Sequence, residues 1–152
     1  MPLDATDRRM LEILQREGRI ANAALAERLH LSPSPCLRRL RALERDGVIR
    51  GYRADLDRAR LGLGLTVFVT LKVDRHSDRT AAAIAEALDR TPEVVSAHIV
   101  SGEGDVLLEV AVADLAAYER LLFDTLLTLP HVSDVRSNFV LRTIKEPGPL
   151  PV

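Results

Sequence analysis

The sequence contains no tryptophan, a single cysteine and few aromatic residues, which make up 3% of its 152 positions. Because Cys36 is the only cysteine, the chain excludes an internal disulfide framework and a zinc site built from cysteines. The lone thiol suits a reducing compartment, and we expect it to be a small buried side chain rather than a redox sensor. With 47% hydrophobic residues, the core must be mainly aliphatic.

Long hydrophobic runs are also absent. No apolar stretch reaches about 18 residues, the length that a membrane-spanning helix needs, and no apolar segment follows a basic N-terminus. The sequence therefore indicates neither a membrane span nor a signal peptide, and we expect a cytoplasmic protein with no membrane partner.

Catalytic and metal-binding patterns are missing as well. No Gly-x-Ser-x-Gly elbow, nucleophile triad or acid–base pair is evident, and the histidines show no paired spacing with acidic neighbours. We therefore expect no enzyme activity, no catalytic residue, no metal and no cofactor. The histidines are His30, His76, His98 and His131.

Positive charge is concentrated in the N-terminal part of a chain whose net charge is −1. Residues 1–60 carry 13 Arg and 9 acidic residues, a net +4, whereas residues 61–152 carry 8 basic and 13 acidic residues, a net −5. A basic module followed by an acidic one indicates a nucleic-acid binder joined to a domain with a second role. We predict domains at residues 1–60 and 61–152.

The stretch from residue 31 to residue 52 predicts a turn, a basic helix and the start of an extended segment. Ser32 or Ser34 can cap this helix, a proline follows each serine, and Gly47 suits its end. A leucine stripe with Cys36 beside it forms the expected buried side: Leu37, Leu40 and Leu43. The opposite side carries Ser34, Arg38, Arg41 and Arg45.

An arginine-rich helix face fits a DNA major groove, although a solvated basic face would show the same pattern. Arginine forms bidentate bonds to guanine or to phosphate, and residues near the helix start are the expected base readers. Arg39 lies off this face, and either an ion pair with Asp7 or DNA contact would explain it. The preceding residues favour DNA binding.

Two shorter helical patterns precede the basic helix. Residues 4–17 predict a helix capped by Asp4 with Asp7 in a box-like position, and Asn22 can cap a second, short helix. A helix, a short helix, a tight turn and a basic helix together predict a helix-turn-helix. Residues 48–56 then predict an extended segment, part wing and part hinge.

The second half alternates strand and helix patterns. Strands are predicted at residues 65–73, 94–100, 106–112 and 135–143, and helices at 78–90 and 115–129. This order predicts a ferredoxin-like βαββαβ domain, an antiparallel sheet with both helices on one face. The chain is therefore α+β, with an N-terminal winged helix-turn-helix. The other sheet face is expected to pack on another subunit, through Thr66, Phe68, Val95 and Val140.

The turn at residues 101–105 connects two of these strands and allows two interpretations. Glycine and aspartate suit a plain β-turn, and the spacing does not fit a phosphate-binding loop. Ser137 on the last strand either adds a polar wall to a site or faces solvent.

The motifs together resemble the Lrp/AsnC ("feast/famine") transcriptional regulators over nearly the whole chain. The second half is similar to their amino-acid-sensing domain through Gly102-x-x-Asp105 and the strand of Phe139 and Leu141. The N-terminal resemblance rests on Asp7-Arg8, Leu11, Leu14, Gly18-Arg19-Ile20, Leu25-Ala26, Leu31-Ser-Pro-Ser-Pro-Cys36, Arg39, Leu43-Glu44 and Gly47-Val-Ile-Arg-Gly-Tyr52.

This resemblance implies a sequence-specific transcriptional regulator that binds double-stranded DNA as a homodimer and assembles into a higher homo-oligomer, commonly an octamer. It also implies an amino-acid effector near the turn, for which the candidate residues are Gly102, Gly104, Asp105 and Ser137. The residue before the aspartate is often bulkier in the family, and here it is Gly104. That departure leaves open an architectural DNA-binding protein whose C-terminal domain only oligomerises; an enzyme has no motif to support it.

Overall fold

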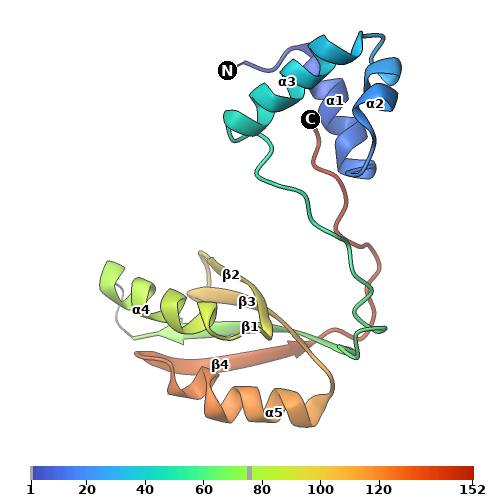
Figure 1. The fold of residues 1–152 in the computed structure, drawn as a ribbon. Coiled ribbons are helices and arrows are strands. Elements are labelled where there is room, and N and C mark those ends of the chain that lie inside the picture. The colour runs from blue at the N-terminus through green and yellow to red at the C-terminus, as the bar shows by residue number, and fades with distance from the viewer. Residues whose placement is uncertain (1, 75–76) are drawn as a thin grey trace. The chain divides into compact units, whose positions relative to one another are not determined.

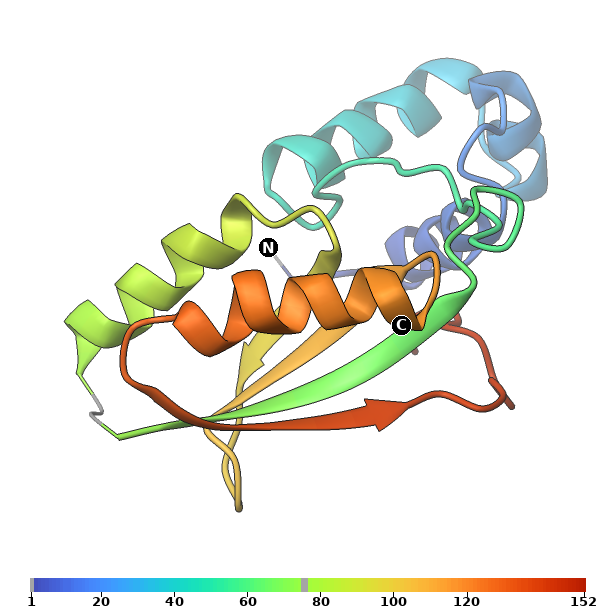
Figure 2. The ribbon, with the colours of Figure 1, turned by 90° about the horizontal axis from the view of Figure 1, so that it is seen from below.

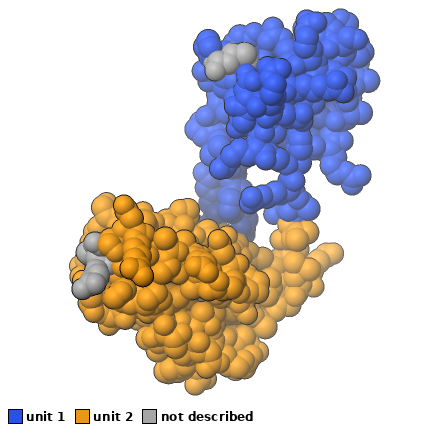
Figure 3. All heavy atoms as spheres, turned by 60° about the vertical axis from the view of Figure 1, so that its left-hand side comes forward, with its two compact units in different colours: residues 1–55, 144–152 blue, residues 56–143 orange. Residues whose placement is uncertain are grey.

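The computed structural model describes residues 2–74 and 77–152 of the chain. The chain divides into two compact units, one formed by residues 1–55 with 144–152 and the other by residues 56–143 (Figure 3). This division differs from the predicted domains in that the C-terminal tail belongs to the first unit. None of the described helices combines the length and the hydrophobicity that a bilayer crossing requires.

Three helices form the first unit: α1 (Ala5–Arg16), α2 (Asn22–Arg28) and α3 (Pro33–Arg45) (Figure 1). The predicted cap of α1 is confirmed, because the Asp4 carboxylate accepts from the Asp7 N–H at 2.8 Å and the Asp4 N–H donates back to Asp7. The predicted cap of α2 is wrong. Ala21 holds that position, and the Asn22 amide donates instead to the Pro33 carbonyl oxygen at 3.0 Å.

The core of this unit is aliphatic, as predicted. Met10, Leu25, Cys36 and Leu43 are almost fully buried where the three helices meet. The predicted leucine stripe of α3 is only partly correct, because Leu37 and Leu40 remain half-buried. In a unit this small, one side of α3 faces only a narrow core, and a single row of its side chains is enclosed.

The second unit is the predicted antiparallel sheet with two helices. Its strands are β1 (Leu65–Val73), β2 (Val94–Ile99), β3 (Val106–Val112) and β4 (Val132–Phe139), in the order β2-β3-β1-β4. The helices are α4 (Asp78–Asp89) and α5 (Leu115–Asp124), which cover the same face of the sheet (Figure 2). Alternate residues of the central strands are fully buried beneath them, namely Val67, Val69, Leu71, Leu108 and Val110.

Two predicted elements end earlier than expected. The helix predicted to reach residue 129 stops at Asp124, because Thr125 leaves the helical region, and a 3₁₀ turn, η1 (Leu126–Thr128), follows. The last strand ends at Phe139, since its partner β1 begins at Leu65 and offers no ladder beyond the bond from the Val140 N–H to the Thr66 carbonyl. Side-chain alternation alone does not reveal where a partner strand stops.

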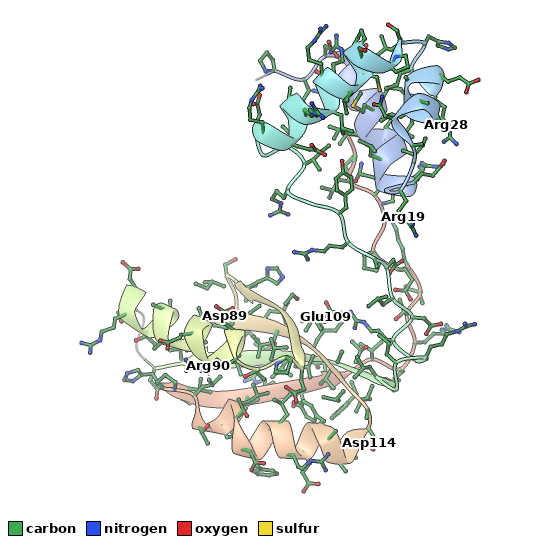
Figure 4. The ribbon with its side chains drawn as sticks, viewed as in Figure 1. Arg19, Arg28, Asp89, Arg90, Glu109 and Asp114 are labelled. Atoms are coloured by element: carbon green, nitrogen blue, oxygen red, sulfur yellow. The ribbon has the colours of Figure 1, made fainter. Side chains whose placement is uncertain are left out.

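The sheet face opposite the helices is partly covered by the chain that precedes β1. Arg58 pairs with Glu109 on β3 at 2.7 Å and donates to the Thr66 hydroxyl at 3.2 Å (Glu109 is labelled in Figure 4). Apolar area remains on this unit, where Phe68 is 40% and Val95 is 47% exposed. Thr66 and Val140 are half-buried.

Candidate DNA-binding helix and ligand site

The ends of α3 follow from its sequence. Ser32 is the N-cap in extended conformation, although its hydroxyl makes no capping hydrogen bond, and Pro33 occupies the first turn, where no N–H is required. After Asp46, Gly47 adopts a positive φ of 73° and turns the chain away from the helix. The Ile49 N–H then closes on the Leu43 carbonyl at 3.1 Å.

The four predicted DNA-facing residues all lie exposed on α3. Their spacing of four, three and four residues keeps Ser34, Arg38, Arg41 and Arg45 on one side of the helix. Arg45 also bonds Asp46 at 3.1 Å, but its side chain is 74% exposed and the pair lies at the surface. The structure therefore presents a continuous basic strip.

Arg39 has a structural partner on α1, which decides between the two alternatives for this residue. Its guanidinium bonds the Asp4 carboxylate at 2.7 Å and the buried Asp7 carboxylate at 2.9 Å. The Asp7 N–H and Arg39 hold the pKa of Asp4 below its usual value. The start of α1 is thus tied to the middle of α3. Asp4 was not foreseen as a partner, although its predicted capping role already placed it beside Asp7.

The turn at residues 101–105 is held against β1 by Asp105. The Asp105 N–H donates to the Leu71 carbonyl at 2.9 Å, and its carboxylate accepts from the Val73 N–H at 2.7 Å. Its own carbonyl accepts from Val100 at 3.0 Å. Asp105 therefore orients the loop relative to β1.

The two glycines of the turn have different reasons for being glycine. Gly102 is exposed and has a φ of 131°, which side chains rarely tolerate. Gly104 is buried, and a Cβ there would lie 1.9 Å from the Thr70 methyl carbon. Thr70 was not singled out from the sequence, because strand alternation gives no sign of which residue a loop covers.

Ser137 lies apart from these residues. Its hydroxyl hydrogen-bonds the Tyr118 hydroxyl of α5, so the side chain faces the helices and not the open side of the sheet. The Tyr118 ring also contacts Phe139 edge-on, with centroids 5.4 Å apart. In the described part of the chain, no hydrogen bond joins Ser137 to residues 102–105.

A hollow of about 570 Å³ lies between α4 and the sheet, and Asp105 is among its lining residues. The lining is mostly aliphatic, with Ile84, Leu88 and Ala97 as examples, while Thr80 adds a hydroxyl. This size falls in the range of small-molecule sites, about 300–1,000 Å³. The α4 residues were predicted only as helix and core. Their small side chains, Ala81 and Ala85, were the available signal of space.

Two family models match the chain. One describes the Lrp/AsnC ligand-binding domain and matches residues 66–150, and the other describes a winged helix-turn-helix DNA-binding domain and matches residues 3–50. The chain belongs to the Lrp/AsnC family. With these two domains, this Lrp/AsnC protein is a DNA-binding transcriptional regulator and not an enzyme, as its sequence predicted.

Relatives resemble this Lrp/AsnC chain over nearly its full length. The leucine-responsive regulatory protein of Escherichia coli K12 is 42% identical over 144 residues, covering 95% of this chain and 88% of that protein. A transcriptional regulator of Neisseria meningitidis, solved as an L-Met complex, is 41% identical with a TM-score of 0.93, covering 99% and 97% of the two chains. A feast or famine regulatory protein of M. tuberculosis complexed with L-methionine is 33% identical with a TM-score of 0.85, covering 95% and 96%.

Cys36 and the histidines take no part in a metal site within the described residues of this Lrp/AsnC protein. Among those residues, no three His, Cys, Asp or Glu side chains are grouped to hold an ion, and His76 lies outside them. Burial raises the pKa of the Cys36 thiol, which keeps it protonated and unreactive.

Proposed function

We propose that this regulator reads double-stranded DNA in a sequence-specific way through α3, and that a free amino acid modulates its DNA binding or assembly. The observation that carries the proposal is the exposed strip of Ser34, Arg38, Arg41 and Arg45 on a helix fixed by Arg39. A fixed helix loses little conformational freedom on docking, so its arginines can discriminate bases. The cytoplasm is the proposed location.

Within this strip the residues have different proposed roles. Arg38 is nearer the start of α3 and is proposed to read a base, with Ser34 beside it, whereas Arg41 and Arg45 are proposed to bind phosphates. A base-reading arginine changes sequence preference when it is removed. A phosphate-binding arginine weakens binding to all sequences and lowers the salt dependence.

An amino acid is the proposed effector because two solved relatives hold methionine and the chain offers matching chemistry. The N–H groups of Gly102, Glu103 and Gly104 make no backbone hydrogen bond in the described residues, so they can receive a carboxylate. The aliphatic hollow beside Asp105 suits an apolar side chain. A packing reason accounts for Gly104, so its presence no longer favours the architectural alternative.

A homodimer within a larger homo-oligomer, such as an octamer, is the proposed assembly. Phe68 and Val95 leave apolar area on the second unit that a partner would cover. Two-fold symmetry would place two α3 helices on half-sites about one or two helical turns apart, in a roughly palindromic operator.

DNA reading is tested by selecting duplexes from a random library with the wild-type protein and measuring their affinity at physiological salt. Arg38→Ala should weaken binding to the selected duplex by about 1–3 kcal/mol and relax the base preference at one position of the site. Arg19→Ala removes the same charge from the connection between α1 and α2 (Figure 4) and is the control. Equal affinities for wild type and Arg38→Ala would contradict the assignment.

The effector is tested by a thermal-shift screen with the twenty amino acids. At least one, expected among the aliphatic or thioether side chains, should raise the unfolding temperature and change DNA affinity. A flat screen with intact DNA binding would favour the architectural alternative.

A further inference from the structure

The chain passes between the two units twice, because the C-terminal tail belongs to the DNA-binding unit and not to the sheet that precedes it. The outgoing connection leaves after α3, and the returning one follows β4. The C-terminus lies beside the three helices (Figure 1). Both connections are fastened near the C-terminal end of α1.

Gln15 fastens the returning tail through its side-chain amide. Its Nε2 donates to the Leu150 carbonyl at 3.1 Å, and its Oε1 accepts from the Leu150 N–H at 2.6 Å. Two facing residues in an antiparallel ladder exchange the same pair of hydrogen bonds. Here one side-chain carboxamide replaces the backbone of a whole partner residue. Gln15 therefore recognises extended backbone and not the leucine side chain, which stays 73% exposed.

Three prolines fix where the tail can bind. Pro147, Pro149 and Pro151 carry no N–H, so Leu150 and Gly148 are the only backbone donors in this stretch. Pro151 also restricts the preceding Leu150 to extended backbone conformations, which reduces the conformational entropy lost on binding. The tail can therefore make this contact only at alternate residues, and the contact is made at Leu150.

Tyr52 fastens the outgoing connection at Gly18, three residues after Gln15 and just beyond the end of α1. Its ring lies over Gly18, where a Cβ would be only 3.8 Å from the Tyr52 Cδ1 atom, and its hydroxyl donates to Glu44 of α3 at 2.9 Å. Burial and the Glu44 carboxylate raise the pKa of Tyr52 to about 12, so the phenol remains a donor at neutral pH. The outgoing connection thus contacts α3 and the turn that follows α1.

We infer that Gln15, Gly18, Tyr52 and Leu150 form an anchor that fixes where the two connections leave the DNA-binding unit, with Gln15 and Tyr52 as positioning residues. A unit tethered by one flexible segment reorients freely, whereas a second attachment restricts rotation of α3. The anchor makes the protein sensitive to the spacing and phase of two half-sites. It does not contact DNA itself. This inference rests on the proposed paired binding of DNA.

The first experiment observes the anchor without DNA. Val152→Cys carries a thiol dye, which labels only that position because Cys36 is fully buried. In full-length protein, the anisotropy decay should show an ordered tail, and adding Gln15→Ala should release it. Arg16→Ala, an exposed neighbour on α1 outside the anchor, is the control and should leave the decay unchanged. A tail that is equally mobile with and without Gln15 overturns the anchor.

The second experiment measures spacing discrimination. Affinities are determined for a selected duplex with two half-sites, for the same duplex with about half a helical turn inserted, and for a single half-site. Gln15→Ala and a chain ending at Lys145 should reduce the discrimination between the first two duplexes about three- to tenfold, the range expected for the net contribution of one hydrogen bond. Single-site affinity should stay within about twofold of wild type, since the anchor makes no DNA contact.

The outcomes separate the inference from the proposed function. If wild type discriminates spacing and Gln15→Ala discriminates equally well, the anchor has no positioning role. If single-site affinity falls in parallel, Gln15 supports folding and the inference is also wrong. If wild type itself binds paired sites no better than single ones, paired DNA binding fails, while the anisotropy decay still decides whether the anchor exists.

Discussion

Gly104 illustrates how a single residue can be dictated by a neighbour that is distant in sequence. The sequence marks this position only as a departure from bulkier family members. The structure supplies a packing reason, because Thr70 of β1 occupies the space where a Cβ would lie. The glycine is therefore required for the loop to lie against the sheet.

We predict that Gly104→Ala lowers the free energy of unfolding by about 1–3 kcal/mol, the usual effect of overpacking. Thr70→Ser in the same chain removes the methyl carbon that lies 1.9 Å from the added Cβ and keeps the hydroxyl. The double variant should recover most of the loss in a denaturant titration. Additive losses in the two variants would show that Thr70 is not the obstacle.

His30 is held in a conformation that disfavours its side chain. It lies in the turn between α2 and α3 with a φ of 53°, and it is exposed. A left-handed residue with a Cβ costs about 1–2 kcal/mol relative to the right-handed region, part of which glycine removes.

We predict that His30→Gly raises the free energy of unfolding by about 1 kcal/mol, because relief of the backbone strain exceeds the added freedom of the unfolded chain. His30→Ala keeps the strain and should show no gain. Denaturant midpoints of the two variants check this, and an equal gain in both would contradict the backbone explanation.

At the scale of elements, the relation between α1 and α3 depends on charge. Arg39 of α3 forms ion pairs with both acidic residues of the α1 capping box. The carboxylates that cap α1 therefore also hold α3 against it. The sequence offered Asp7 as a partner but left DNA contact equally open. Only the placement of the two helices decided between them.

We predict that this contact weakens in acid. The pKa of Asp4 lies below its ordinary value of 3.8, because the Asp7 N–H and Arg39 favour the ionised form. A lowered folded-state pKa contributes stability that is present above the unfolded pKa and is lost as pH falls through the folded one. The unfolding temperature should therefore drop below about pH 4.

Asp4→Asn keeps a capping oxygen but removes the charge, so its unfolding temperature should depend less on pH in this range. Glu86→Gln makes the same change on α4, in an exposed pair with Arg90 just after that helix, and is the control. Circular dichroism melts between pH 7 and pH 3 measure both. A constant difference between Asp4→Asn and wild type across this range would contradict the argument.

Element types followed from periodicity, whereas some ends did not. The β1 alternation and the Asp4 cap of α1 could be predicted because each depends on residues close in sequence. The α2 cap was wrong because Asn22 found a partner eleven residues away. The end of β4 depended on the length of β1, which no local pattern of β4 contains.

At the scale of the whole molecule, one face of the sheet supplies the proposed assembly surface. Phe68 lies mid-strand between Glu109 and Asn138 on the neighbouring strands and remains 40% exposed. We therefore place the proposed interface at this exposed aromatic ring.

We predict that wild type scatters light as a multimer at micromolar concentration and that Phe68→Glu dissociates it, because a buried unpaired carboxylate is costly. Phe123→Glu makes the same change on α5, in the layer on the other side of the sheet, and should leave at least a dimer. A monomeric wild type, or a mass unaffected by Phe68→Glu, would contradict the assignment.

The sequence alone determined the order of elements, the basic strip on α3 and the family, because hydrophobic period, turn residues and motif spacing are local properties of a chain. The tertiary structure decided the partners of Arg39, the orientation of Ser137 towards Tyr118, the need for glycine at 104 and the return of Leu150 to Gln15. Each of these joins residues far apart in sequence, and such contacts exist only once the chain has folded and brought them within bonding distance.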